Sequence, residues 1–262
     1  MKLGVSTWSL LGLDVVSAVR AIGDAGFDYV ELWGEVPHAY PDWVDRSELR
    51  NALASYQMAL TMHAPFTDLN PASPFEPVKS AMERTLEGFV DFGAWLDARV
   101  ITIHPGSVHS GLMVPQAAQS AASVLKKMVR AADGRLQVNV ENQAKGRSNY
   151  HLPLASTTES LESLLDQDKA LNFTLDTGHA HVNGQDPSLL MRRAGPRLTE
   201  VHLHDNSGES DEHLVPGEGT ANLGPLMKSL AGSGAFVCLE LDPYRYSPEA
   251  VIRASSSLKA QI

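Results

Sequence analysis

Short apolar segments recur along the whole chain, and stretches with helical periodicity separate most of them. Apolar runs of this length that are rich in β-branched and aromatic side chains are typical of buried strands. The eight segments are LGVSTWSL from Leu3, YVELW from Tyr29, LTMH from Leu60, VITIH from Val100, LQVNVE from Leu136, LNFTLD from Leu171, LTEVHLH from Leu198 and AFVCLEL from Ala235. Alternation of strand and helix predicts a parallel sheet with its helices outside.

The intervening stretches carry helix signals of their own. Apolar residues recur at helical spacing within residues 15–25, 75–96, 117–132, 158–165 and 189–194. The predicted N-caps are Asp14, Ser47, Thr158 and Asp186. Gly26 and Gly134 follow predicted helices, where a left-handed residue is favoured.

The chain length selects among parallel architectures. Its 262 residues, divided by eight, leave about 33 residues for each strand and helix pair, which is typical of a (β/α)8 TIM barrel. This favours a closed barrel over an open doubly wound sheet. Because no linker or low-complexity run interrupts the pattern, residues 1–262 are predicted to form one α/β domain. Residues 64–74 and 206–219 follow strands directly and are predicted to be loops at the barrel mouth, where TIM barrels place their chemistry.

Charge and cysteine content exclude several classes of protein. Asp and Glu number 31 against 21 Lys and Arg, so the net charge of -10 argues against a broad surface for nucleic acid. Cys238 is the single cysteine, so a reducing cytoplasm is the expected location. The first residues are too short and polar for a signal sequence, and no apolar run approaches the roughly 18 residues of a membrane span.

Metal-ligand side chains close six of the eight apolar segments. Strands that are buried on both faces are normally apolar, so charged or imidazole groups at their carboxyl ends require a reason. Further candidates follow in DTGH and DEH. The predicted ligands are His63, His104, Glu141, Asp176, His179, His202, Asp211, His213 and Glu240.

A single histidine at a strand end is more often structural than a ligand. The barrel, however, gathers all nine groups at one rim, where buried carboxylates would repel each other without cations between them. Carboxylates with imidazoles suit zinc, manganese, cobalt or iron, and nine groups allow one to three ions, with zinc or manganese favoured. His38, His109, His151 and His181 are not predicted to bind metal, and loop or surface positions are favoured for them.

Seven motifs in order resemble the xylose isomerase-like barrel superfamily, in the branch of endonuclease IV and the sugar phosphate isomerases and epimerases. The motifs are GFDYVEL from Gly26, HPG from His104, VEN from Val140, LDTGH from Leu175, HLHDN from His202, DEHLVPGEG from Asp211 and CLEL from Cys238. The resemblance covers nearly the whole chain. It implies a core metal site of Glu141, Asp176, His202 and Glu240. It also implies that His63, His104, His179, Asp211 and His213 occupy the additional ligand positions of the three-zinc cluster of endonuclease IV.

The chain departs from both branches of the superfamily. Endonuclease IV members carry basic and intercalating loops, whereas the third loop here reads APFTDLNPASPF, which argues against DNA as the substrate. Epimerase members typically place an arginine shortly after the histidine of the seventh strand, but HLHDNSGESDEH contains none. The basic residues near the predicted rim are Lys145, Arg147 and Arg245, for which solvated loop charges are the favoured interpretation.

Two chemistries stay open. The favoured one is a metal-dependent sugar or sugar phosphate isomerase or epimerase, in which Glu141 and Glu240 exchange a proton beside a metal-polarised carbonyl. The alternative is an endonuclease IV-like multi-zinc phosphoester hydrolase acting on a small or nucleic-acid substrate, in which Glu141 bridges two ions and is held ionised. Non-catalytic metal binding is a third class, and no stripe typical of an interaction module is present. A homo-oligomer is compatible with this sequence.

The wall of the substrate site is predicted to come from residues around the ends of the first two strands, together with His204 at the end of the seventh. The residues expected to contact substrate are Trp8, Glu31, Trp33, His38 and His204. Core packing is an equal alternative for the tryptophans. His202 and His204 are two positions apart, so both face the same side of the strand.

Overall fold

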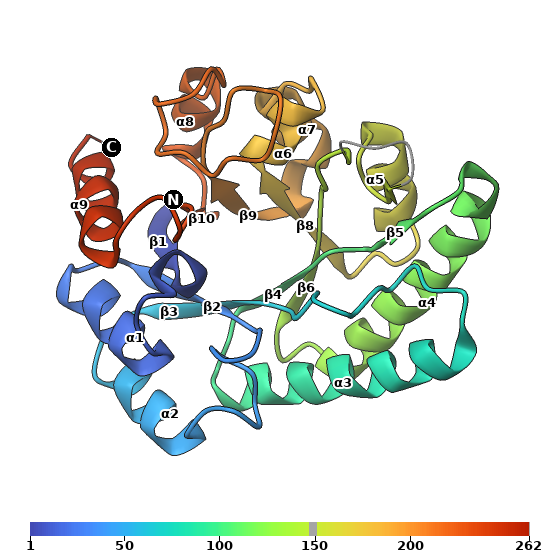
Figure 1. The fold of residues 1–262 in the computed structure, drawn as a ribbon, viewed down its shortest axis with the longest axis horizontal. Coiled ribbons are helices and arrows are strands. Elements are labelled where there is room, and N and C mark those ends of the chain that lie inside the picture. Colours follow the sequence, from blue (N-terminus) through green and yellow to red (C-terminus); the bar gives the residue numbers. More distant parts are fainter. Residues whose placement is uncertain (147–150, 262) are drawn as a thin grey trace.

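The strands close into one parallel barrel with helices around it (Figure 1). The computed structural model describes residues 1–146 and 151–261. The eight barrel strands are β1 (Lys2–Ser6), β2 (Tyr29–Trp33), β3 (Ala59–His63), β4 (Val100–Ile103), β6 (Gln137–Glu141), β8 (Leu171–Asp176), β9 (Leu198–Leu203) and β10 (Phe236–Leu239). Each predicted apolar segment therefore supplies one strand, and the predicted (β/α)8 barrel is confirmed.

Neighbouring strands are parallel, and β1 closes the barrel by pairing with both β2 and β10. The register aligns the carboxyl ends of distant segments. Asp176 at the end of β8 lies opposite His202 in β9, and Trp33 at the end of β2 lies opposite His63 in β3. The predicted ligands thus share one rim of the barrel although they are spread over most of the chain.

The helices form the outer layer (Figure 1). They are α1 (Val15–Asp24), α2 (Arg46–Ala54), α3 (Glu76–Trp95), α4 (Val114–Ala132), α5 (Thr158–Leu165), α6 (Thr177–Val182), α7 (Pro187–Ala194), α8 (Gly224–Leu230) and α9 (Pro248–Lys259). In α3 the buried Met82, Leu86, Phe89 and Gly93 recur at helical spacing, so one face packs on the strands. None of the described helices is long and apolar enough to cross a membrane.

Two of the predicted N-caps are wrong by one or two residues. Asp14 and Asp186 cap α1 and α7 as predicted. The side chain that caps α2 belongs to Asp45 rather than Ser47, because its carboxylate accepts from the backbone of Glu48. The cap of α5 is Thr157 rather than Thr158, since Thr157 and Ser160 form a reciprocal capping box. Gly26 and Gly134 both have positive φ, as expected.

Two short strands outside the barrel were not predicted. Residues Ser107–Val108 (β5) and Leu152–Pro153 (β7) pair antiparallel in the loops beyond β4 and β6. Segments of two residues carry too little periodicity to be recognised in the sequence.

The barrel interior holds a polar network in addition to its apolar core. Thr102 Oγ1 lies 2.6 Å from Thr174 Oγ1 and donates to Glu200 Oε2 at 3.0 Å. Asn139 extends the network by donating to Thr174 Oγ1 at 2.8 Å. These groups are fully buried, so they place hydrogen-bonding capacity in the barrel below the rim.

Close contact between β1 and β2 requires glycine at position 4. A Cβ there would lie 2.5 Å from the Tyr29 ring and 2.6 Å from the Tyr29 carbonyl oxygen. We expect Gly4→Ala to lower the free energy of unfolding by roughly 1–3 kcal/mol, because the strands must move apart. Urea unfolding followed by circular dichroism measures the change. Gly88→Ala is the control. Gly88 lies on an exposed face of α3, and a Cβ added there would meet nothing within 4 Å outside the helix's own backbone, so we expect this variant to be neutral or stabilising. Equal stability of the Gly4→Ala protein and the wild type would contradict this account.

Candidate metal centre

A cavity of about 210 Å³ opens at the carboxyl-terminal rim of the barrel. It is lined by Trp8, Trp33, His63, Phe66, His104, Glu141, His179, Asp211, His213 and Glu240. Seven of these ten residues are predicted metal ligands. A larger cavity of about 580 Å³ lies at the amino-terminal ends of the strands and contains none of them.

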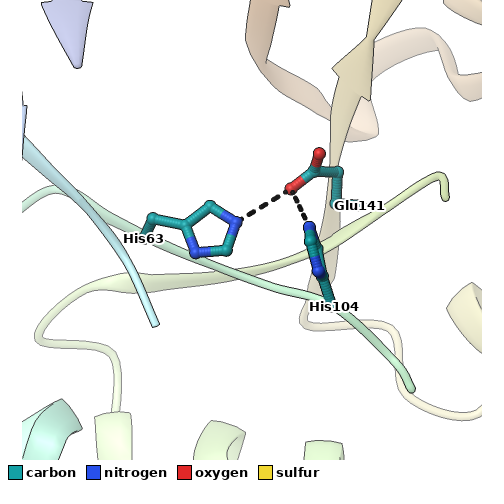
Figure 2. Close-up of side chains that lie close together, drawn as sticks. All are labelled: His63, His104 and Glu141. Carbon is teal, nitrogen blue, oxygen red and sulfur yellow. Dashed lines mark hydrogen bonds and ion pairs between the residues drawn. The ribbon is translucent and has the colours of Figure 1, made fainter. Parts of the chain in front are cut away.

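Glu141 is the centre of the cluster. Its Oε2 atom lies 3.2 Å from His63 Nε2 and 3.3 Å from His104 Nε2, so two imidazoles converge on one carboxylate oxygen (Figure 2). Its Oε1 atom lies 3.3 Å from His179 Nδ1 and 3.4 Å from His202 Nδ1. The carboxylate therefore contacts imidazoles from four different strand ends or loops.

Asp211 gathers a second group of imidazoles. Its Oδ2 atom lies 3.1 Å from both His179 Nε2 and His213 Nε2. Asp211 and His213 belong to the loop after β9, whereas His179 lies in α6 directly after β8. The spacing of DTGH explains the position of His179, because Asp176 caps α6 and accepts the backbone N–H of His179 at 2.6 Å.

Asp176, His202 and Glu240 form a third group. Their candidate ligand atoms lie within 4.8 Å of one another, and all three residues are buried. His202 Nδ1 lies 3.4 Å from both Glu141 Oε1 and Glu240 Oε2, yet it has no hydrogen-bond partner. Glu141 thus connects the groups, and the four positions of the implied core site lie side by side.

Burial and charge act against each other on these pKa values. Burial raises the pKa of Glu141, but the neighbouring His202 and His104 outweigh it and hold that pKa well below its ordinary value. Burial lowers the pKa of His63, but the hydrogen bond and charge of Glu141 raise it to about 9. Similarly, Asp211 outweighs burial and raises the pKa of His213 to about 9. Without a metal, protons on His63 and His213 therefore supply positive charge to the carboxylates, whereas burial lowers the pKa of His104.

Two buried carboxyl groups behave differently. Burial raises the pKa of Glu240 to about 8, although His202 opposes this shift. Burial, with the nearby charge of Glu31, raises the pKa of Glu200 to about 8 as well. Glu141 and Glu240 thus flank the same imidazole nitrogen, and their pKa values are shifted in opposite directions.

The donor set fits a divalent cation. The Nδ1 atom of His202 is buried between two carboxylates without a hydrogen-bond partner, a position that a cation or a proton must compensate. Three other imidazoles are each hydrogen-bonded through Nδ1 to a backbone carbonyl oxygen: His63 to Ala64 O, His179 to Asn142 O and His213 to Glu240 O. The Nε2 atom of each of these rings faces a carboxylate. This ring orientation is typical of metal-binding histidines, and mixed nitrogen and oxygen donors suit zinc or manganese.

Several residues that sequence reasoning missed hold the cluster in place. The side chain of Asn142 bonds both backbone groups of Asp176, at 2.9 Å and 2.8 Å. Glu35 Oε1 accepts the backbone N–H groups of Phe66 and Thr67, which places the Phe66 ring against His63 and His104. For Asn142, its place in the VEN motif was the available signal.

Asp205 organises the loop that carries Asp211 and His213. Its Oδ1 atom accepts from the backbone of Asn206 and Ala221, and its Oδ2 atom accepts from Gly217 and Gly219. A Cβ at Gly219 would lie 2.3 Å from Asp205 Oδ1, so glycine is required there. The signal in the sequence was an acid directly after a strand, followed by a glycine-rich stretch.

The residues predicted to bind substrate divide into two groups. Trp8 and Trp33 line the cavity, whereas Glu31, His38 and His204 do not. Glu31 contacts His202 Nε2, and His38 lies near Thr7 Oγ1 and Leu13 O. His204 lies 2.9 Å from Asp176 Oδ2 and stacks on the His213 ring; a Cβ at Gly178 would collide with its imidazole.

The remaining histidines and rim cations lie outside the cavity wall. His109 and His151 are exposed, and His181 lies 2.9 Å from Thr220 Oγ1. The side chains of Lys145 and Arg245 are exposed as well, and Arg147 lies outside the described residues.

Comparison with known proteins identifies the family. The chain belongs to the xylose isomerase-like TIM barrel family, whose model matches residues 19–261. It is 32% identical to an uncharacterised protein of Methanocaldococcus jannaschii, over 89% of this chain and 80% of that one. It is 24% identical to fructoselysine 3-epimerase of Escherichia coli O157:H7, over 97% of both chains. A solved structure of a D-tagatose 3-epimerase-like protein has a TM-score of 0.86 and 27% identity, covering 99% of this chain and 96% of that one.

The role of Asp205 can be tested by Asp205→Asn. Each oxygen of the Asp205 carboxylate accepts from two backbone N–H groups. In the variant the amide nitrogen replaces one of these oxygens and cannot accept, so we expect two of the four hydrogen bonds to be lost. The expected loss of stability is roughly 1–3 kcal/mol, with faster hydrogen exchange in residues 206–221. Exchange mass spectrometry measures the second effect. Asp186→Asn, a helix cap with one such bond, is the control and leaves this loop protected. Unchanged exchange in the loop of Asp205→Asn would contradict the assignment.

The raised pKa of Glu200 predicts a pH dependence of stability. An unfolded glutamate ionises near 4.5, whereas the folded state keeps this proton up to about 8. The folded protein therefore binds more protons between these values, and its stability falls as the pH rises through them. We expect Glu200→Gln to abolish this part of the loss, which is on the order of 1 kcal/mol or more between pH 5 and pH 8. Urea unfolding in the presence of EDTA measures the difference. Parallel pH profiles of variant and wild type would rule the prediction out.

Proposed function

We propose that the protein is a divalent-metal-dependent epimerase or isomerase of a small sugar. The family and the epimerase relatives support a sugar isomerase or epimerase class. The observation that carries the proposal is the pair of carboxyl groups, Glu141 and Glu240, each of which has an oxygen 3.4 Å from His202 Nδ1 at the cavity. Groups of this kind can divide the roles of base and acid at one reacting carbon.

The reaction assigns one role to each carboxyl group. Glu141 removes the proton from the carbon beside the substrate carbonyl. Glu240, on the other side of His202 Nδ1, returns a proton to that carbon. Asp176, His202, Glu141 and Glu240 would hold the ion, with the other five predicted ligands available for one or two more. A bound divalent ion supplies electrostatic stabilisation of the negative charge that develops on the two substrate oxygens.

The cavity wall favours an unphosphorylated sugar over a sugar phosphate. No lysine or arginine is among the residues that line it in the described part of the chain, so none of these side chains is available there to bind a phosphate. Trp8, Trp33 and Phe66 supply apolar surface for the C–H faces of a sugar, and the adjacent imidazoles and carboxylates can bind its hydroxyl groups.

One observation favours the second candidate, a multi-zinc phosphoester hydrolase. Both oxygens of Glu141 face imidazoles, with His63 and His104 on Oε2 and His179 and His202 on Oε1. This arrangement suits a carboxylate that bridges two ions. A bridging carboxylate is held ionised and is a poor proton carrier, so the number of bound ions separates the two functions.

The test uses protein purified without chelator and measures its metal content before turnover. In D2O with free ketohexoses and ketopentoses, we expect deuterium at the carbon beside the carbonyl and formation of the epimer, both followed by NMR. Glu240→Gln is expected to slow exchange by about 100-fold or more, since it removes a proton-transfer group. Glu209→Gln, an exposed substitution in the loop after β9, is the control and exchanges like the wild type.

Contrary outcomes point to the alternative. Nearly three ions per chain, release of phosphate or alcohol from a small phosphoester, and no deuterium exchange with any ketose would replace the epimerase by the hydrolase. Absence of bound metal after equilibration with Zn²⁺ or Mn²⁺ would contradict both functions.

A further inference from the structure

Glu31 lies behind the metal-facing imidazole of His202 rather than in the substrate cavity. Its side chain is fully buried, and its Oε2 atom lies 3.0 Å from His202 Nε2. Glu31 is in β2 and His202 in β9, so the pair joins strands from opposite parts of the chain across the barrel interior. The cavity wall does not include Glu31, so this carboxylate does not face the substrate space directly.

The other nitrogen of the same ring faces the predicted ion. His202 Nδ1 is buried, has no hydrogen-bond partner, and lies 3.4 Å from one oxygen each of Glu141 and Glu240. One side of the imidazole is thus held by a carboxylate, and the other side is presented to the carboxylates of the metal site. The orientation of the ring decides which nitrogen the metal meets.

His202 differs in this respect from three other imidazoles of the cluster. The rings of His63, His179 and His213 are held by backbone carbonyl oxygens, at 2.8, 2.8 and 3.1 Å. These three use Nδ1 toward the carbonyl and Nε2 toward the site, whereas His202 uses Nε2 toward Glu31 and Nδ1 toward the site. A carboxylate partner makes a stronger hydrogen bond than a neutral carbonyl.

We propose that Glu31 is the positioning residue of the metal centre, because it accepts the Nε2 proton of His202 and so presents the Nδ1 lone pair to the ion. Glu31 is itself held in place: β2 pairs with β1 at Ser6 and with β3 at Thr61 at this level, and Cys238 Sγ lies 3.7 Å from Glu31 Oε1. A carboxylate behind a metal-binding imidazole fixes its orientation and raises its basicity. This inference rests on the metal site of the proposed function, not on its reaction.

Two substitutions separate the hydrogen bond from simple packing. Glu31→Leu keeps an apolar volume in the barrel but removes the acceptor. We expect it to raise the dissociation constant for Co²⁺ by about 10–100-fold, measured by competition with a chromophoric chelator. Glu31→Gln keeps an amide oxygen that can accept from Nε2, so the expected increase is smaller than that of the leucine variant. Glu200→Gln is the matched control: this buried carboxyl has an oxygen within 4.8 Å of the Glu31 and His202 ligand atoms, but its hydrogen bond goes to Thr102 and not to the imidazole. We expect it to bind Co²⁺ like the wild type.

A spectroscopic measurement tests the ring directly and does not depend on activity. In Zn²⁺-loaded protein with ¹⁵N-labelled histidine, we expect His202 to show zinc on Nδ1 and a slowly exchanging proton on Nε2. Glu31→Leu should lose the slow exchange of this proton. Zinc on Nε2 of His202 in the wild type would overturn the proposal even if no variant folds. Equal loss of affinity in Glu200→Gln and Glu31→Leu would overturn it too, since barrel packing would then explain both. If the wild type binds no metal at all, the proposed function fails instead.

Discussion

Glu141 is buried among four imidazoles, and most of the site is arranged around the charge of that carboxylate. A buried carboxylate without compensation is strongly unfavourable. His63, His179 and His202 compensate it when protonated, whereas burial lowers the pKa of His104. A divalent cation between the same groups would compensate the carboxylate without the protons. The raised imidazole pKa values and the predicted metal affinity are two expressions of one electrostatic requirement.

The barrel brings the imidazoles and carboxylates together, and groups behind them hold them in position. The ligands rest on strand ends, and a second layer of groups fixes their orientation. Asn142 bonds the backbone of Asp176, Glu31 bonds His202, and Asp205 binds four backbone N–H groups of the loop that carries Asp211 and His213. Because strands and buried hydrogen bonds position these groups, the fold itself fixes the arrangement of the ligand side chains.

The sequence alone predicted the barrel and the composition of the cluster. Parallel strands end at one rim, so metal-ligand side chains at six strand ends had to converge once the barrel was assumed. His63, Glu141 and Asp176 each end a strand, as the sequence indicated. The sequence did not predict the roles of Glu31 and His204, because alternation along a strand tells which side a residue faces but not how deep its side chain lies.

What the sequence by itself determined is the alternation of strands and helices, the closed barrel, and the chemical character of its rim. These follow from periodicity, residue type and chain connectivity, which are local or nearly local properties. Only the tertiary structure decided which imidazole nitrogen faces which carboxylate, that Glu31 supports His202, and that Glu141 and Glu240 have oppositely shifted pKa values. These properties depend on burial and on distances of a few ångströms between strands far apart in the chain, and no sequence spacing encodes them.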